Sequence, residues 1–110
     1  MAVTDVVIVF VTAPSDDEAR RIGRTLVAER LAACVNVIGP LHSIYRWEGQ
    51  VQEDAEQLLV VKARRSDVDA LAARVRALHS YEVPEVVALD VVAGSAPYLA
   101  WVLESTAREG

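Results

Sequence analysis

The chain has 110 residues, of which 53% are hydrophobic and 25% are charged, and its formal net charge is −5. A chain of this length and composition can bury one real core, which excludes disordered and fibrous proteins. The negative charge repels phosphate backbones, and no basic stripe is segregated in the sequence, so we expect no nucleic-acid partner. The predicted organisation is one domain over residues 1–110.

The first predicted element is a strand over residues 6–11, where nearly every side chain is apolar and most are β-branched. This composition is typical of a strand that is covered on both faces. The apolar run is far too short to span a membrane, so we expect no membrane segment. Ser15 and Glu18 then form a capping box, and apolar side chains recur at helical spacing as far as Leu26, which predicts an amphipathic helix ending near Arg30.

A long hairpin follows the first helix. Its first arm, residues 34–47, is interrupted by Gly39-Pro40, which suits a bend or bulge because proline cannot donate to a ladder. Glu48-Gly49-Gln50 predicts a tight turn, since glycine accepts a positive φ angle. The second arm covers residues 51–62. Both arms exceed the usual strand of about five or six residues, so the hairpin is expected to overhang the domain.

The second half of the chain repeats the pattern of the first. A helix is predicted from a cap at Ser66 to Leu78, because its apolar residues keep one face at helical spacing. The loop HSYEVPE, residues 79–85, ends this helix. An apolar strand over residues 86–92 and a short helix with Tyr98 to Val102 complete the chain.

This order predicts an α+β fold of the ferredoxin-like, split β-α-β type, with an antiparallel sheet and two helices on one face. The strands are apolar almost throughout, so the second face of the sheet should not lie bare in water. The short last helix is too small to cover it. We therefore expect the chain to associate with copies of itself.

The first candidate site residues belong to the hairpin: Tyr45, Trp47, Glu48, Glu53 and Lys62. One interpretation places them in a cleft between chains. The alternative treats the aromatics as interface packing and the charges as a solvated rim, and it is favoured for the two aromatics because interface cores are rich in such residues.

The second candidates belong to the loop after the second helix. His79, Tyr81, Glu82 and Glu85 can supply acid–base groups or metal ligands. No second histidine stands at a metal-binding offset, and a histidine near a helix C-terminus is equally well explained by its interaction with the helix dipole.

The single cysteine, Cys34, cannot form an internal disulfide, which favours the cytoplasm as the location of the protein. Its apolar neighbours indicate a small buried side chain and not an activated thiolate. The sequence also has no glycine-rich phosphate loop, no GxSxG motif and no nucleophile with an evident base partner, so we predict that the protein is not an enzyme.

Six segments, taken in order, carry a resemblance: VTAPSDDEAR, AERLAACVNV, SIYRWEGQVQEDAE, LLVVKAR, HSYEVPEVVALDV and PYLAWV. Together they resemble the CutA divalent-cation-tolerance family over nearly the whole chain. That resemblance implies ferredoxin-like protomers, similar in architecture to PII-type signal proteins. It further implies homotrimers in which the long hairpins complete a sheet between subunits.

The resemblance also implies a link to copper and other divalent metals. Some bacterial members have a cysteine at the position of Val11 and a second histidine at the position of Leu78, so only His79 remains of three proposed ligands. One imidazole with carboxylates is a weak copper site. We therefore expect no obligatory cofactor and name His79 as the candidate ligand for a divalent ion such as copper.

We predict a cytoplasmic homotrimer that acts in divalent-metal tolerance as a binding or signalling-type protein. The hairpin of one chain is expected to meet the loop of a neighbour in a ligand-binding cleft. Its predicted residues are Tyr45, Trp47, Glu53, Lys62, Tyr81 and Glu82.

Two alternative functions remain open at this point. The first is a small-molecule hydrolase or lyase, in which Tyr81 or His79 transfers protons and Lys62 stabilises an anion. The second is a PII-like assembly scaffold that presents a surface to another protein.

Overall fold

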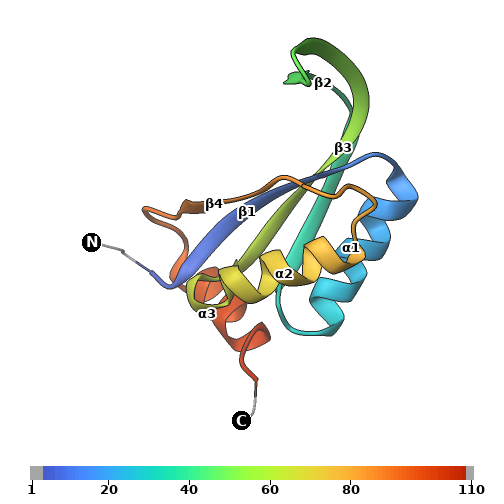
Figure 1. The fold of residues 1–110 in the computed structure, drawn as a ribbon. Coiled ribbons are helices and arrows are strands. Elements are labelled where there is room, and N and C mark those ends of the chain that lie inside the picture. The colour runs from blue at the N-terminus through green and yellow to red at the C-terminus, as the bar shows by residue number, and fades with distance from the viewer. Residues whose placement is uncertain (1–3, 109–110) are drawn as a thin grey trace.

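The computed structural model describes residues 4–108 (Figure 1). Its elements are β1 (Val6–Ala13), α1 (Asp16–Ala28), β2 (Cys34–Trp47), β3 (Gln50–Arg64), a 3-10 turn (Arg65–Asp67), α2 (Val68–Leu78), β4 (Val86–Asp90) and α3 (Ala96–Ser105). Within this described part, none of the helices has the length and apolar character needed to cross a membrane.

The four strands form one antiparallel sheet in the order β2-β3-β1-β4. β1 lies at the centre, where Val9 pairs with Val61 of β3 on one side and with Ala88 of β4 on the other. α1 and α2 pack side by side on one face of this sheet (Figure 1). The predicted ferredoxin-like α+β fold is confirmed.

The main core lies between the sheet and these two helices. Alternate residues of β1, such as Val9 and Val11, are fully buried against Ile22 and Leu26 of α1 and Leu71 of α2. Each such side chain contributes about 1.5–3 kcal/mol by leaving water. The prediction that β1 is covered on both faces is wrong for the single chain, because its intervening residues are only partly buried.

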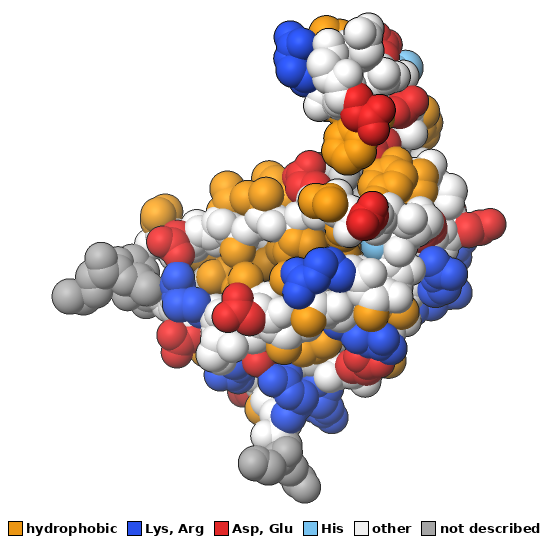
Figure 2. All heavy atoms as spheres, in the orientation of Figure 1, with side chains coloured by type: hydrophobic (Ala, Val, Ile, Leu, Met, Phe, Trp, Pro, Cys, Tyr) orange, Lys and Arg blue, Asp and Glu red, His pale blue; other side chains and the backbone are white. Residues whose placement is uncertain are grey.

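The opposite face of the sheet is largely open, and it is defined by the alternate residues Ile8, Phe10, Val60, Val87 and Leu89. Val87 is 50% exposed and Leu89 is 42% exposed. Hydrophobic side chains along β4 are visible at the surface in Figure 2. We call this surface the open face.

α3 covers one end of the open face only. Val102 of α3 packs with Val6 and Ala33 in a small second core. On the remainder of the open face, Ile8, Phe10 and Val60 are partly buried, whereas Val87 and Leu89 of β4 are exposed.

The caps of the two helices α1 and α2 differ in part from the prediction. Ser15 does cap α1, since its Oγ accepts from the backbone N of Glu18 at 3.2 Å, but the Glu18 carboxylate turns away to the backbone N and Oγ of Ser80. The capping box is thus half formed. α2 begins after a 3-10 turn that contains Ser66, so its N-cap is Asp67 and not Ser66. The Asp67 carboxylate makes no capping hydrogen bond and instead binds Arg108.

The hairpin formed by β2 and β3 projects beyond the rest of the molecule (Figure 1). The radius of gyration is 14.5 Å, against about 13 Å for a compact chain of this length. The register of the hairpin shifts between Ile38 and Leu41, at the predicted bulge. The predicted tight turn at Glu48-Gly49-Gln50 is a two-residue turn of Glu48 and Gly49, with φ angles of 51° and 77°, and Gln50 already belongs to β3.

Candidate functional site

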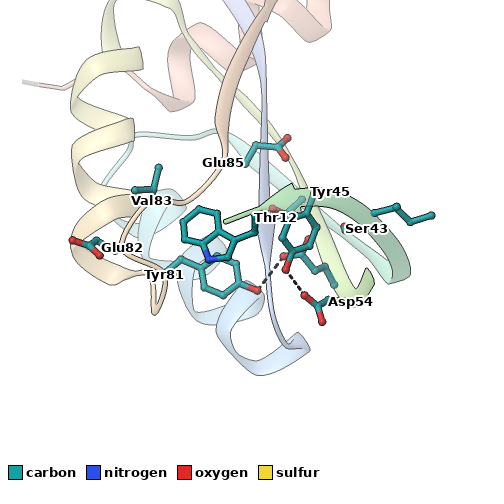
Figure 3. A pocket seen from close by; sticks show the side chains of 11 residues that line it. Thr12, Ser43, Tyr45, Asp54, Tyr81, Glu82, Val83 and Glu85 are labelled. Atoms are coloured by element: carbon teal, nitrogen blue, oxygen red, sulfur yellow. Dashed lines mark hydrogen bonds between the residues drawn. The ribbon is translucent and has the colours of Figure 1, made fainter. Parts of the chain in front are cut away.

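A groove of about 670 Å³ lies where the hairpin meets the loop after α2 (Figure 3). The hairpin contributes Ser43, Ile44, Tyr45, Trp47, Asp54 and Glu56. The body of the molecule contributes Thr12 of β1 and, from the loop, Tyr81, Glu82, Val83 and Glu85. Figure 2 shows acidic and hydrophobic side chains together where the hairpin leaves the body.

The two-residue turn determines which hairpin side chains reach the groove. It pairs Trp47 with Gln50, so that Ser43 lies opposite Asp54. Successive strand residues point to opposite faces, and paired residues share a face. Asp54 and Glu56 therefore lie on the same side of the hairpin as Tyr45 and Trp47.

The Tyr45 hydroxyl donates a hydrogen bond to Oδ2 of Asp54 (Figure 3). This hydrogen bond raises the pKa of Tyr45 above its usual value, and the charge of Asp54 acts in the same direction. The phenol therefore remains a hydrogen-bond donor at neutral pH, and one oxygen of the Asp54 carboxylate is held by it.

Tyr81 makes the corresponding contact from the loop. Its hydroxyl donates to Oε2 of Glu56 at 3.2 Å, and Glu56 is only 8% exposed. Burial, followed by the charge of Glu56 and this hydrogen bond, raises the pKa of Tyr81 to about 12. Tyr81 is thus held in its protonated form, which is unsuited to a general base at neutral pH.

His79 anchors the loop to the sheet. Its ring is buried, with Nε2 2.7 Å from the carbonyl oxygen of Thr12, and its Nδ1 accepts from the backbone N of Tyr81 at 2.9 Å. A carbonyl can only accept, so Nε2 carries the proton and Nδ1 is the acceptor. Both ring nitrogens are therefore engaged by backbone groups, and the predicted role of His79 as a metal ligand does not fit this geometry.

Glu18 holds the start of the same loop. Its Oε2 accepts from the backbone N of Ser80 at 3.0 Å and from the Ser80 hydroxyl at 2.9 Å. Burial alone would raise the pKa of Glu18, but these two hydrogen bonds, together with the positive charge of Arg21, outweigh burial and lower it. The loop that carries Tyr81 is thus tied to both α1 and β1.

Two predicted cleft residues lie outside the groove. Glu53 points to the other side of the hairpin, where its Oε2 is 3.9 Å from Nδ1 of His42. Lys62 is six residues beyond Glu56 along β3, and its Nζ hydrogen-bonds Asn36 and lies 3.9 Å from the Cys34 sulfur. In the single chain, strand alternation directs Glu53 away from the groove, and the length of β3 separates Lys62 from it. Their place in a cleft between chains stays a prediction.

Four of the six predicted cleft residues, Tyr45, Trp47, Tyr81 and Glu82, do line the groove. The hairpin and the loop that bring them together in this groove belong to one chain. The cleft between the hairpin of one chain and the loop of a neighbour stays a prediction.

Asp54 and Glu56 are not among the predicted site residues. The sequence does contain a signal for them, because a two-residue turn at Glu48-Gly49 fixes the register and puts residues 54 and 56 on the face of Tyr45. The hydrogen bond between Tyr81 and Glu56 joins two segments that lie far apart in the sequence, and no sequence pattern predicts it.

The donors of the groove do not fit a copper centre. Across residues 4–108, no three side chains of His, Cys, Asp or Glu are placed so that they could hold one metal ion. Cys34 lies beside Lys62 at the other end of the open face. High copper affinity needs several N or S donors in a defined geometry, and these residues do not provide one.

Comparison with known proteins gives the same family from sequence and from structure. Residues 7–105 match the sequence model described as CutA1 divalent ion tolerance protein. The chain is 52% identical over 99 residues to the divalent-cation tolerance protein CutA of Thermus thermophilus, covering 90% of this chain and 96% of that protein. It is 46% identical over 100 residues to the chloroplastic protein CutA 1 of Oryza sativa, covering 91% of this chain and 56% of that protein. The chain therefore spans about half the length of this plant relative.

Solved structures agree with the fold. The Thermus thermophilus Cut A1 structure matches with a TM-score of 0.91 and 50% identity, covering 93% of this chain and 99% of that one. The Oryza sativa CutA1 structure matches with a TM-score of 0.92 and 43% identity, covering 96% and 97% of the two chains.

Proposed function

The chain belongs to the CutA1 divalent ion tolerance protein family, and from this membership we propose that it serves the divalent-cation response as a non-enzymatic protein that binds a cationic ligand in the groove. One observation carries the proposal. Four carboxylates line the groove, from Asp54, Glu56, Glu82 and Glu85, while its described lining contains no Lys, Arg or His. Such a groove attracts cations and repels anions.

The absence of catalysis is part of this proposal. The two groups that would transfer protons in a hydrolase or lyase are Tyr81 and His79. The pKa of Tyr81 is raised to about 12, and both nitrogens of His79 are engaged by backbone groups. Lys62, the candidate anion stabiliser, lies outside the groove. These features favour a binding protein over the enzyme alternative.

We propose a PII-like homotrimer as the working form, with the cytoplasm as its location. The exposed apolar side chains of the open face support association, because patches of this kind mark interaction sites. β2 and β4 are both edge strands, and the hairpin projects beyond the body of the molecule, so unpaired strand edges are available to another chain. The free thiol of Cys34 is consistent with a reducing compartment.

We also propose that His79 is not a copper ligand in this protein, so that any part it plays in copper tolerance does not depend on copper binding at His79. Copper binding by a single chain lacks a suitable donor set in the described residues, as the geometry above indicates.

A thermal-shift series tests the cationic ligand directly. Organic amines and divalent cations are compared with organic anions of similar size at constant ionic strength. Cations at saturating concentration are expected to raise the Tm by several degrees, since a ligand that binds only the folded state stabilises it. The stabilisation should shrink in Glu56→Gln and persist in Glu53→Gln, which removes a charge on the other side of the same strand.

Stabilisation by anions or neutral compounds alone would contradict the proposal. An equal loss of the effect in Glu53→Gln and Glu56→Gln would also contradict it, because it would show that overall charge, and not the groove, attracts the ligand.

A further inference from the structure

We infer that the loop after α2 is held by a proton-sensitive switch. When the ring of His79 takes up a second proton, its Nδ1 exchanges one partner, the backbone N of Tyr81, for another, the carboxylate of Glu18. The inference goes beyond the proposed function and does not depend on which ligand the groove binds. It starts from a buried titratable side chain to which the proposed function gives no part.

Two groups lie within reach of Nδ1 of His79. The backbone N of Tyr81 lies 2.9 Å from it and donates to it, while Oε2 of Glu18 lies 3.3 Å from the same atom. The other ring nitrogen is already assigned, because Nε2 lies 2.7 Å from the carbonyl oxygen of Thr12, which can only accept. In the neutral ring, Nδ1 therefore has a lone pair and accepts from Tyr81.

The charged ring cannot keep the contact with Tyr81. Both nitrogens of a protonated imidazole are donors, so Nδ1–H and the N–H of Tyr81 would be two donors facing each other at 2.9 Å. The Glu18 carboxylate is acceptor-only, and its oxygens can take this proton in addition to the two hydrogen bonds from Ser80. Protonation thus replaces a neutral hydrogen bond to the loop with a charge-assisted one to α1.

Glu18 is the anionic group in direct contact with the ring. The side chain of His79 is fully buried, and that of Glu18 is 12% exposed. Burial by itself would raise the pKa of Glu18, but the hydrogen bonds from Ser80 outweigh burial and lower it. Glu18 is therefore ionised throughout the range of about pH 8 to 5, in which histidines ordinarily gain a proton.

The other elements packed against His79 contribute less to its charge balance. Arg21 of α1 donates to the last carbonyl of α2 at 3.2 Å, and its positive charge opposes the second proton. The ring of Tyr81 lies 4.8 Å from that of His79, and its hydroxyl is bound to Glu56 of β3. β1 presents only the uncharged carbonyl of Thr12. The carboxylate in direct contact thus decides where a second proton on the ring goes.

The loop can respond because few other contacts hold it. Residues 80–85 form neither helix nor strand, and Val83 is 75% exposed. Segments with few buried contacts open locally at little cost. Tyr81 forms part of the wall of the groove, as Figure 3 shows, and its hydroxyl reaches Glu56 only while the loop is in place. Loss of the amide contact in acid is therefore expected to release Tyr81 from Glu56 and to move this wall.

Solution nuclear magnetic resonance between about pH 8 and 5, the range in which histidines ordinarily titrate, tests the inference. His42→Asn removes the only other histidine and leaves His79 as the single imidazole. The ring signals of His79 and the amide signal of Tyr81 are expected to shift with one common midpoint. Below that midpoint, the Tyr81 amide should lose protection against hydrogen exchange, after correction for the pH dependence of exchange itself.

Two further variants in this background identify the partners. Glu18→Gln keeps the shape of the side chain and should move the midpoint to lower pH by about half a unit or more, because a contacting negative charge favours the charged ring. Asp17→Asn removes a charge from the neighbouring exposed position of α1 and should move it by less than about 0.2 units. His79→Gln should abolish the transition at the Tyr81 amide, and the dispersion of the amide signals checks that each variant is folded.

Four outcomes would overturn the inference. They are a His79 ring that does not titrate in this range, separate midpoints for His79 and Tyr81, equal effects of Glu18→Gln and Asp17→Asn, and a Tyr81 transition that persists in His79→Gln. All these measurements are made without a ligand. A failure of the groove to bind cations would therefore leave the switch standing, and a failure of the switch would leave the proposed function untouched.

Discussion

At the scale of single residues, His79 shows how a chemically versatile side chain can serve the fold. It is the one residue of the chain that matches the three copper ligands implied by the family resemblance, which made it the candidate for metal binding. Its buried ring instead joins the carbonyl of Thr12 to the backbone N of Tyr81. Sequence reasoning identified the residue but could not assign this role, because both partners are backbone groups that any sequence provides.

We predict that His79→Leu lowers the free energy of unfolding by about 1–3 kcal/mol, because it leaves a backbone donor and a backbone acceptor without their partner. Urea denaturation measures this change. The control is His42→Leu, since the His42 side chain is 78% exposed and its loss should cost less than about 0.5 kcal/mol. Equal effects of the two substitutions would show that His79 does not anchor the loop.

At the scale of elements, the hairpin was predictable and the loop contact was not. The turn residues Glu48 and Gly49 and the bulge at Gly39-Pro40 appear in the sequence as local signals, and the structure has both. Strand alternation then assigns Asp54 and Glu56 to the face of Tyr45. The meeting of the hairpin with the loop depends on the curvature of two long strands, which no local pattern encodes.

The two hydrogen bonds from Ser80 to the Glu18 carboxylate join α1 to the loop after α2, and we call them the clamp. The contribution of the clamp to stability depends on pH. The pKa of Glu18 is lowered in the folded chain, so its stabilising effect is fully present above the unfolded-state value of about 4.3 and is lost as the pH falls through the folded-state value. Glu18→Gln should therefore cost about 1 kcal/mol near neutral pH and progressively less in acid.

Urea denaturation of wild type and Glu18→Gln across this pH range measures the clamp. Glu104→Gln, at an exposed position on α3, is the control for loss of one carboxylate. A difference between wild type and Glu18→Gln that stays constant from neutral pH into acid would rule out an ionised clamp.

At the scale of the whole molecule, the open face is an apolar surface that a single chain covers only in part. The nearly continuous apolar strands predicted it from the sequence, because helices cover one face of the sheet and α3 covers only one end of the other. The number of copies that cover this face does not follow from periodicity, and the homotrimer remains a proposal based on the family.

Val87→Asp places a charge on the open face at a position that is 50% exposed in the single chain. The substitution should leave the protomer folded and prevent assembly, since an unpaired charge is costly to bury in an interface. Sedimentation equilibrium should give about three times the 12.0 kDa chain mass for wild type and the single-chain mass for the variant.

Val27→Asp, at a position 41% exposed on the helix side of the molecule, is the matched control and should assemble like wild type. A wild-type protein with the mass of one chain at micromolar concentration would contradict the proposed assembly. An assembled Val87→Asp would show that copies meet through another surface.

The central claim is that the groove binds cations through its carboxylates and aromatic rings, and the fluorescence of Trp47 reports on it most directly. Trp47 lines the groove, and the only other tryptophan, Trp101, belongs to α3, so Trp101→Phe leaves a single emitter at the site. Titration of this variant with hexane-1,6-diamine should change the emission saturably, while hexane-1,6-diol should leave it unchanged. Unchanged emission with the diamine and with divalent cations, or an equal change with the diol, would contradict the claim.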